Sequence, residues 1–397
     1  MEKIIMKRCI ISILALFILL SCNQHVSRSV LDNMNAMVDS VRVRYVPDTR
    51  DDVFDIFVSQ HEKKLIVKGI TSVAEAKTEL INRLGTIMPD LIDSIRVLPD
   101  KNYGDRIYAV ISMAVVNLHT EPNHDAELAT QLLLGSVVET LHNEQEWYRV
   151  RTLEGYIAWI HGSSFDRMNR EQLEAWKLAP KVIFTDNDGG LSYESPDENG
   201  LSATELTFGN LLKLEGDSGR FFYVSYPHGR KAFILKSQSQ KLDEWKAEIQ
   251  LTEESIVQKA LELRGKPYLW GGTSTSAMDC SGFVKIVYQK HGIVLRRDAS
   301  QQVKTGMPVD ISAGYDNLRP GDLLFFGTKA EEDRAERVRH VGIYMGNKEF
   351  VHASGDDVHV SSFEHEHPYY DEGNTKEFIY AQRMLGSIGT EGIWEWE

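Results

Sequence analysis

The sequence predicts a multidomain α+β protein, with a small α+β unit and two β-rich repeats in front of a larger C-terminal α+β domain. Residues 108–165 and 182–238 both consist of short β-rich runs broken by turn residues, and they align without a gap at an offset of 74 residues. Residues 241–397 begin instead with helical apolar spacing and continue with alternating, strand-like segments. The chain has 397 residues, of which 42% are hydrophobic, so several cores can be buried.

The net charge of the chain at pH 7 is −14. A protein this acidic is not expected to bind nucleic acid or an anionic membrane surface through charge, and solubility accounts for the acidity. We therefore predict no nucleic-acid partner.

Residues 1–22 are predicted to be an export signal and not part of the fold. A basic start, MEKIIMKR, precedes an apolar stretch at 10–20 that is about half as long as a membrane-spanning helix. Cys22 follows Ser21 at the end of this stretch, which resembles a bacterial lipobox and implies cleavage before Cys22 and lipidation of that cysteine. An ordinary signal peptide and an uncleaved anchor are the alternatives. We expect an exported protein, anchored by lipid to a bacterial membrane and facing the periplasm or the cell surface.

Cleavage at that position would leave Cys280 as the one unmodified cysteine of the mature chain. Of the three cysteines in the sequence, Cys9 lies in the export signal and Cys22 would carry lipid. No disulfide framework is then expected, and an unpaired thiol in an exported protein is a candidate reactive group. A buried structural cysteine is the alternative.

Residues 23–45 are predicted to be a polar tether with some helix, and residues 46–103 a small α+β unit that spaces or supports the rest. The expected elements of the unit are two strands, a helix capped by Ser72 and a short closing strand, at 53–58, 65–70, 72–83 and 95–98.

The two repeats are placed at residues 104–168 and 181–240, with a linker helix at 169–180. About 55–60 residues with several short strands suit a small β-barrel. The first copy, with NLHTEP, LLLGSVVE and EWYRVRTLEGYIAWI, resembles bacterial SH3 domains, although His119 stands where that family usually has Arg. Such barrels are usually binding modules, and the alternative is a spacer.

Cys280 lies between Asp279 and Ser281, after a loop rich in Gly, Ser and Thr and before an apolar run with helical spacing. A thiol in the first turn of a helix faces the positive end of the helix dipole, which favours the nucleophilic thiolate. The pattern therefore indicates a catalytic cysteine if a base lies close by.

Two histidines provide the candidate base and its partner. His340 and His352 lie on predicted strands that are joined by a turn at 346–348. A three-residue loop would place Gly342 opposite His352, with His340 on the same face, whereas a two-residue loop would place the histidines on opposite faces.

With the first geometry, Cys280 is the predicted nucleophile, His340 its base and later the acid for the leaving amine, and His352 the group that orients His340. The backbone N–H of Cys280 is a candidate oxyanion donor, and the Tyr268 hydroxyl a second one. A zinc site built from the cysteine and the two histidines is the alternative. We predict neither a metal nor a cofactor, and we expect His365 and His367 to be solvated loop residues.

Four motifs follow one another in the last domain: YLWGGTSTSAMDCSGFV, RRDASQQ, LRPGDLLFF and HVGIYMGNKEFVHASG. Through them residues 255–385 resemble the NlpC-type family of papain-like bacterial cell-wall cysteine peptidases. With two SH3-like barrels in front, the chain resembles the γ-D-glutamyl-L-diamino acid endopeptidases of that family. The resemblance implies a papain-like catalytic domain at 241–397 and hydrolysis of the bond between D-Glu and the diamino acid in peptidoglycan stem peptides.

In that group the free L-Ala amine of the substrate is bound by the catalytic domain and the first barrel together. Carried over by motif, the substrate-binding residues are Tyr268, Trp270, Asp279 and Ser281 of the catalytic domain and Glu127 and Tyr156 of the first barrel. Leu201 and Arg230 occupy the equivalent positions of the second repeat, so the second barrel lacks this chemistry. Ordinary surface residues are the alternative for the barrel pair.

The predicted function is a cysteine endopeptidase that acts on stem peptides of the form L-Ala-γ-D-Glu-diamino acid, in cell-wall turnover or recycling. An amidase or endopeptidase acting on intact, crosslinked wall is one alternative. A lipoprotein that binds wall peptides without cutting them is another. The preference for meso-diaminopimelate or L-Lys stays open at this point.

Overall fold

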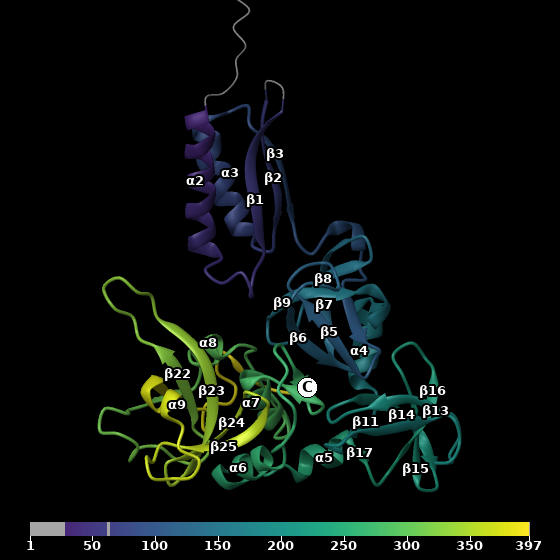
Figure 1. Ribbon diagram of the computed structural model, residues 1–397. Helices are drawn as coiled ribbons and strands as arrows, with labels where there is room; N and C mark the ends of the chain where they lie inside the picture. Colours follow the sequence, from purple (N-terminus) through teal and green to yellow (C-terminus); the bar gives the residue numbers. More distant parts are fainter. Residues whose placement is uncertain (1–27, 62–63, 397) are drawn as a thin grey trace, which may run out of the picture. The chain divides into compact units, whose positions relative to one another are not determined.

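The computed structural model describes residues 28–61 and 64–396 (Figure 1). The predicted export signal and Cys22 lie outside the described residues. The described residues divide into two compact units, with the boundary between Leu98 and Pro99. In the described part of the chain no helix is long and apolar enough to cross a membrane.

The N-terminal unit packs two helices against a three-stranded sheet. Its strands lie in the order β1-β2-β3, with β1 antiparallel and β3 parallel to β2. Its elements are α2 (Arg28–Tyr45), β1 (Phe54–His61), β2 (Lys64–Thr71), α3 (Ala74–Ile87) and β3 (Ile92–Val97).

Residues 23–45 were expected to be a polar tether with some helix; the helix is present as α2, but it belongs to this unit and not to a tether. Met34, Val38 and Val41 are buried in one core with side chains of β1, β2 and α3. Spacings of four and three residues place them on one face of the helix, which the sheet needs to close its core. Because most residues of this segment are polar, its overall composition does not reveal the short apolar stripe.

Ser72 does not cap α3. Val73 is the capping residue and makes no side-chain bond to the helix. The Ser72 hydroxyl instead donates to Asp52 and accepts the N–H of Val53, so it ties the end of β2 to the start of β1.

The two repeats have the same strand order, which confirms the internal duplication. The orders are β10-β4-β7-β8-β9-β5-β6 and β17-β11-β14-β15-β16-β12-β13. The first barrel comprises β4 (Tyr108–Ile111), β5 (Val115–His119), β6 (Leu128–Leu133), β7 (Val137–Glu144), β8 (Trp147–Arg151), β9 (Ile157–His161) and β10 (Phe165–Met168). The second comprises β11 (Lys181–Phe184), β12 (Gly190–Tyr193), β13 (Ser202–Leu206), β14 (Leu211–Ser218), β15 (Phe221–Ser225), β16 (Lys231–Leu235) and β17 (Ser239–Lys241).

The predicted linker helix is α4 (Arg170–Leu178). Asn169 and Gln172 form a capping box at its start, and Leu173 and Trp176 are buried. Residues 165–168 belong to β10 and not to the helix.

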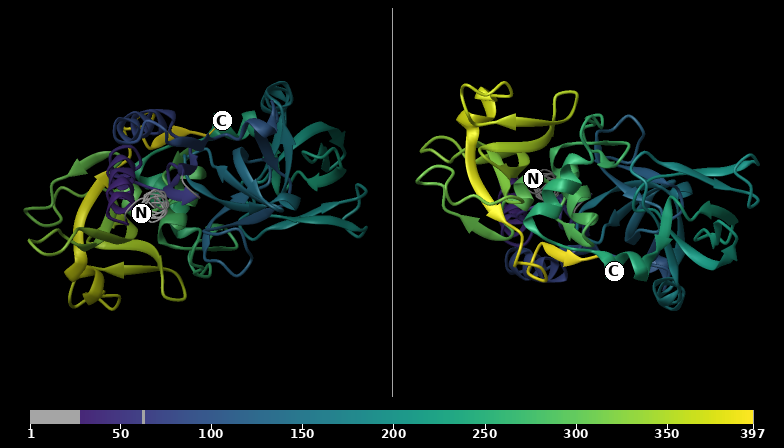
Figure 2. Two further views of the ribbon diagram at one scale, coloured as in Figure 1. Left: turned by 90° about the horizontal axis from the view of Figure 1, so that it is seen from above. Right: turned by 90° about the horizontal axis from the view of Figure 1, so that it is seen from below.

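The last domain is built around an antiparallel sheet in the order β21-β26-β22-β23-β24-β25, with helix α7 packed on β23 and β24. Figure 2 shows this sheet in green to yellow beside the green helices. The strands are β21 (Met307–Val309), β22 (Leu323–Thr328), β23 (Arg337–Gly346), β24 (Glu349–Ser354), β25 (Asp357–Ser362) and β26 (Phe378–Arg383). The helices are α5 (Leu242–Glu248), α6 (Glu253–Leu261), α7 (Cys280–Gln289), α8 (Ala299–Gln302) and α9 (Glu372–Glu377), and two short ladders pair β18 (Thr273–Ser274) with β19 (Ala277–Met278) and β20 (Ile293–Leu295) with β27 (Ile393–Glu395).

Candidate active site

Cys280 is the first residue of α7, as the sequence predicted. Asp279 is the capping residue, and its carboxylate accepts the N–H of Gly282 at 2.7 Å. The turn is tight, because a Cβ at Gly282 would lie 2.0 Å from the carbonyl oxygen of Gly272. The glycine in the motif DCSG therefore lets the preceding loop cross directly over the first turn of the helix.

His340 and His352 lie on the adjacent strands β23 and β24 and contact each other. Nε2 of His340 is 2.7 Å from Nδ1 of His352, and Nε2 of His352 is 3.0 Å from the hydroxyl of Ser361 on β25. The two histidines thus form a hydrogen-bonded chain that ends on Ser361, a residue that the sequence analysis did not single out.

Of the two loop lengths considered, the hairpin has the two-residue turn, which was expected to put the histidines on opposite faces, yet a bulge restores the other register. Asn347 and Lys348 form a two-residue turn with φ of 52° and 62°, and Gly346 pairs with Glu349. A bulge between Tyr344 and Gly346 then shifts the register by one residue. Continuing the ladder from the Ile343–Val351 pair places Gly342 opposite His352, as predicted.

The thiol of Cys280 faces the strand that carries His340. The backbone N–H of Val341, the next residue on β23, is close enough to the Cys280 sulfur to favour the thiolate and so to lower the pKa of the thiol. Tyr268, from the loop before α7, is close enough for the cysteine to influence its hydroxyl: burial, and then Cys280 and Asp279, raise the pKa of Tyr268 to about 12. The fold therefore places Cys280 and Tyr268 beside the strand that carries His340, and His340 against His352.

Burial determines the protonation of these groups. It raises the pKa of the Cys280 thiol to about 12, assisted by the Asp279 carboxylate and opposed by the Val341 N–H and Arg297. Burial also lowers the pKa of His340 to about 4 and that of His352 well below its ordinary value. The buried site therefore favours a neutral thiol and neutral imidazoles, contrary to the thiolate expected from the helix dipole alone.

The Asp279 carboxylate, predicted to bind the substrate's ammonium group, is occupied by groups of the protein. Arg297, next to α8, donates to both of its oxygens, with Nη2 at 2.6 Å from Oδ2 and Nη1 at 3.2 Å from Oδ1. The Gly271 N–H and the Ser281 hydroxyl also donate to it. Asp279 and Ser281 thus hold the start of α7 in place, a task that the sequence analysis did not foresee.

Glu127 and Trp270 meet across the boundary between the first barrel and the catalytic domain. The indole Nε1–H of Trp270 donates to Oε1 of Glu127 at 2.7 Å, while 62% of the Trp270 surface is exposed. An exposed carboxylate and an exposed aromatic face are thereby presented together on the loop that leads to Cys280. Tyr156, by contrast, is 7% exposed and packs in the core of the first barrel, so it is not an ordinary surface residue.

Further bonds hold the first barrel against the catalytic domain. Gln131 and Thr273 make three hydrogen bonds between β6 and β18. The buried side chains of Glu154 and Lys285 form an ion pair that joins the barrel to the middle of α7. Glu127 is therefore part of a fixed interface.

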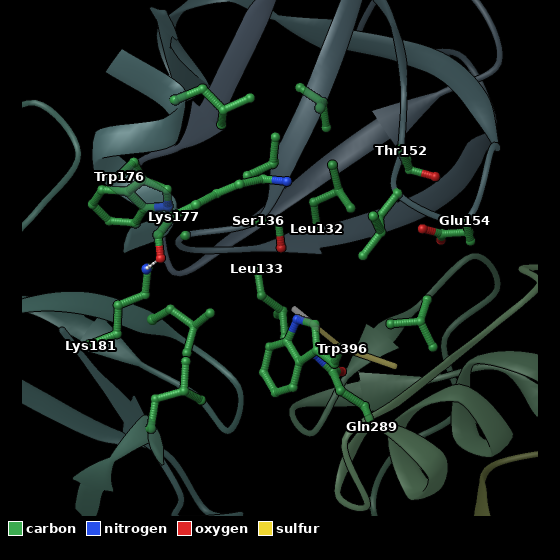
Figure 3. Close-up of a pocket in the computed structure, with 18 of the residues that line it drawn as sticks. Leu132, Leu133, Ser136, Thr152, Glu154, Trp176, Lys177, Lys181, Gln289 and Trp396 are labelled. Carbon is green, nitrogen blue, oxygen red and sulfur yellow. Dashed lines mark hydrogen bonds between the residues drawn. The ribbon is translucent and has the colours of Figure 1, made fainter. Parts of the chain in front are cut away.

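A cavity of about 550 Å³ lies where the two barrels, helix α4 and the catalytic domain meet (Figure 3). Its wall includes Leu133, Trp176, Lys181 and Trp396. Burial, together with the nearby Lys246, lowers the pKa of Lys181 to about 8. Neither Cys280 nor the two histidines line this cavity, so it is separate from the thiol site.

The remaining candidate ligands are dispersed. His367 lies 3.5 Å from Glu349, and the ring of His365 packs near Tyr370, both in the loop before α9. Over residues 28–61 and 64–396, no group of three or more His, Cys, Asp or Glu side chains is arranged to hold a metal ion.

Comparison with known proteins gives matches for the catalytic domain and for the first barrel. Residues 265–376 match the NlpC/P60 family, and residues 118–165 match the bacterial dipeptidyl-peptidase Sh3 domain. Over 243 residues the chain is 32% identical to the gamma-D-glutamyl-L-lysine dipeptidyl-peptidase of Bacillus subtilis, which covers 58% of this chain and 73% of that protein. Over 285 residues it is 30% identical to dipeptidyl-peptidase 6 of Lysinibacillus sphaericus, which covers 66% and 94% respectively.

A solved structure shows the same fold. The NlpC/P60 family protein from Bacillus cereus superposes with a TM-score of 0.59 at 24% identity, covering 70% of this chain and 99% of that one. Fold and site together define a papain-like cysteine peptidase domain behind SH3-like barrels. The chain belongs to the NlpC/P60 family of cysteine peptidases, and the predicted resemblance is confirmed.

Proposed function

We propose that the protein hydrolyses the bond between γ-D-Glu and the diamino acid in peptidoglycan stem peptides that carry a free N-terminal L-Ala. The observation that carries this proposal is the Glu127–Trp270 pair, because it presents a carboxylate for an ammonium group beside the loop of Cys280. The name of the Bacillus subtilis relative, gamma-D-glutamyl-L-lysine dipeptidyl-peptidase, supports the same substrate class.

The hydrogen-bond chain of the two histidines suits proton transfer from the thiol. If Nε2–H of His340 donates to Nδ1 of His352, then Nε2–H of His352 donates to Ser361, and Nδ1 of His340 keeps a free lone pair. That lone pair can accept the Cys280 proton. The resulting imidazolium and thiolate stabilise each other in the buried site, although burial disfavours either charge alone.

In the proposed reaction the Cys280 sulfur attacks the γ-carbonyl carbon of D-Glu. In this proposal the backbone N–H of Cys280 and the Tyr268 hydroxyl are the donors to the oxyanion. Imidazolium His340 then protonates the departing amine, which leaves a thioester between Cys280 and the L-Ala-γ-D-Glu acyl group. Water, deprotonated by His340, attacks the thioester, so the dipeptide is released and the thiol is restored.

Replacing Cys280 by Ala tests the reaction. We expect kcat on L-Ala-γ-D-Glu-diamino acid to fall by roughly four orders of magnitude while the protein remains folded, since only the nucleophile is removed. Product analysis by mass spectrometry on peptides with L-Lys and with meso-diaminopimelate gives the preferred leaving group. Undiminished cleavage by the variant would refute a thiol mechanism, and release of new termini from intact sacculi alone would favour action on crosslinked wall.

Blocking the substrate's amine tests the role of Glu127. N-acetylated stem peptide should be cleaved at least about tenfold more slowly than the free peptide, because an amide cannot pair with the carboxylate. Glu127→Gln should reduce this difference mainly by raising KM for the free peptide. Equal rates for free and blocked peptides would contradict the proposal.

We also propose that lipid on Cys22 anchors the protein to a membrane after export, on the basis of the lipobox-like segment. Expression of the full chain with a labelled fatty acid should label the wild type and not Cys22→Ala. Recovery of the wild-type protein from the soluble fraction without label would argue against an anchor.

A further inference from the structure

Arg297 connects the two halves of the candidate site. Its side chain is 1% exposed, and it donates to four acceptors. Nη1 and Nη2 reach Asp279, Nη1 also reaches the Ser281 hydroxyl at 2.8 Å, and Nε reaches the Thr130 hydroxyl at 2.9 Å. Asp279 and Ser281 flank Cys280, whereas Thr130 belongs to β6 of the first barrel.

We propose that Arg297 is a positioning residue that fixes the first turn of α7 against the first barrel, so that Cys280 and Glu127 keep the separation that the substrate requires. This inference rests on the proposed function, because it assumes that an acyl carbon at Cys280 and an ammonium group at Glu127 belong to one ligand. Glu127 lies three residues before Thr130 and directly precedes the strand to which Thr130 belongs.

The planar guanidinium suits this position. Two of its N–H groups form parallel bonds to one carboxylate, and the third nitrogen is directed the other way, toward the barrel. A lysine ammonium cannot span both sides with one rigid fork. The side chain therefore couples the orientation of the helix start to the position of β6.

The duplicated barrel has a threonine at the equivalent position, which provides an internal control for Thr130. Thr204 is the equivalent residue on β13, at the same offset of 74, and its backbone pairs with the Ser192 hydroxyl. Gln131–Thr273 and Glu154–Lys285 join the first barrel to the catalytic domain independently of Arg297. Loss of the Thr130 hydroxyl should therefore change only the local position of β6 relative to the first turn of α7, while the two domains stay joined.

Thr130→Val, with Thr130→Ser and Thr204→Val as controls, tests the link to the barrel. We expect Thr130→Val to raise KM for the free stem peptide about tenfold with kcat within about twofold of wild type, and to reduce discrimination against the N-acetylated peptide. Thr130→Ser, which keeps the hydroxyl, and Thr204→Val should behave as wild type. An unchanged KM and discrimination in Thr130→Val, or an equal loss on both peptides, would overturn the proposal.

Two measurements on Arg297→Lys do not use the stem peptide, so they separate this proposal from the proposed function. Amide hydrogen exchange in residues 127–131 should become faster, although the substitution is in the other domain. The pH profile of Cys280 alkylation by iodoacetamide should move to higher pH, because Asp279 loses its bidentate partner. Unchanged exchange and an unchanged profile in a folded variant would refute the positioning role. If Arg297→Lys does not fold, hydrogen exchange in Thr130→Val decides.

Discussion

His340 is a basic group that the fold keeps uncharged, so it makes stability depend on pH. Its pKa falls from about 6.5 in the unfolded chain to about 4 in the folded protein, because of burial. Between these values the unfolded chain binds the additional proton, so stability is full above pH 6.5 and is lost as the pH falls toward 4. Lowering the pH from 7 to 5 should reduce the unfolding free energy by about 2 kcal/mol more in wild type than in His340→Gln.

Urea unfolding of both proteins at the two pH values measures this difference, and equal losses would show that His340 is not kept neutral by the fold.

His352 acts on the reaction through His340. Two substitutions test this role, one that removes the hydrogen-bond acceptor and one that keeps it. His352→Ala removes the acceptor at 2.7 Å from the His340 Nε2 and leaves a space, so we expect kcat to fall roughly 100-fold or more with a smaller change in KM. His352→Asn retains an oxygen that can accept the same N–H and should recover much of the activity. Steady-state kinetics on the free stem peptide provide the test, and equal activity of the two variants would argue against an orienting role.

At the scale of single residues, the sequence predicts the groups with distinctive chemistry better than the groups that support them. Cys280, His340 and His352 could be identified because a thiol and two histidines occur in strongly patterned segments. Arg297 could not, because its role depends on Thr130, which is 167 residues away in sequence. The same limitation applies to Asp279, because its partner Arg297 is 18 residues away in sequence and the contact between them depends on the fold.

At the scale of the secondary-structure element, the start of α7 depends on a glycine at its third position. Gly282→Ala would place a methyl group 2.0 Å from a backbone oxygen that cannot move independently of the Cys280 loop. We expect a loss of about 2–3 kcal/mol in stability, in line with overpacking, together with loss of activity. Gly85→Ala in α3 is the matched control, since its Cβ would have no atom within 4 Å and alanine favours helices by up to about 1 kcal/mol.

Thermal unfolding and activity of the two variants would be compared, and a Gly282→Ala protein that is as stable and active as wild type would contradict this account of the turn.

Element patterns also explain which parts of the fold were predictable. The two barrels were predictable because a constant offset of 74 residues aligns the strand-forming segments of the second repeat with those of the first. The β23–β24 hairpin was harder, since a two-residue turn and a bulge together give the register that a three-residue loop would give. Helix α2 was missed as part of the first unit because its apolar stripe consists of few residues in a polar segment.

At the scale of the whole molecule, the Glu154–Lys285 ion pair links the first barrel directly to the helix of the nucleophile. Both side chains are largely buried, at 7% and 14% exposure, so each charge depends on the other. His228 occupies the position equivalent to Glu154 in the second barrel, so this link is specific to the first copy. Removing one partner leaves an unpaired buried charge, whereas replacing both by apolar groups removes the desolvation penalty as well.

We therefore expect Glu154→Leu and Lys285→Met to destabilise the protein by about 3–5 kcal/mol each and the double variant to recover most of that loss. The double variant should also keep the KM of wild type, because Gln131, Thr273 and Arg297 still hold the first barrel in place. Denaturant unfolding and KM for the four proteins of the cycle provide the measurement. If the double variant is as unstable as the sum of the singles, the pair is not coupled. If it is stable but has a raised KM, the charges themselves set the position of Glu127 relative to Cys280.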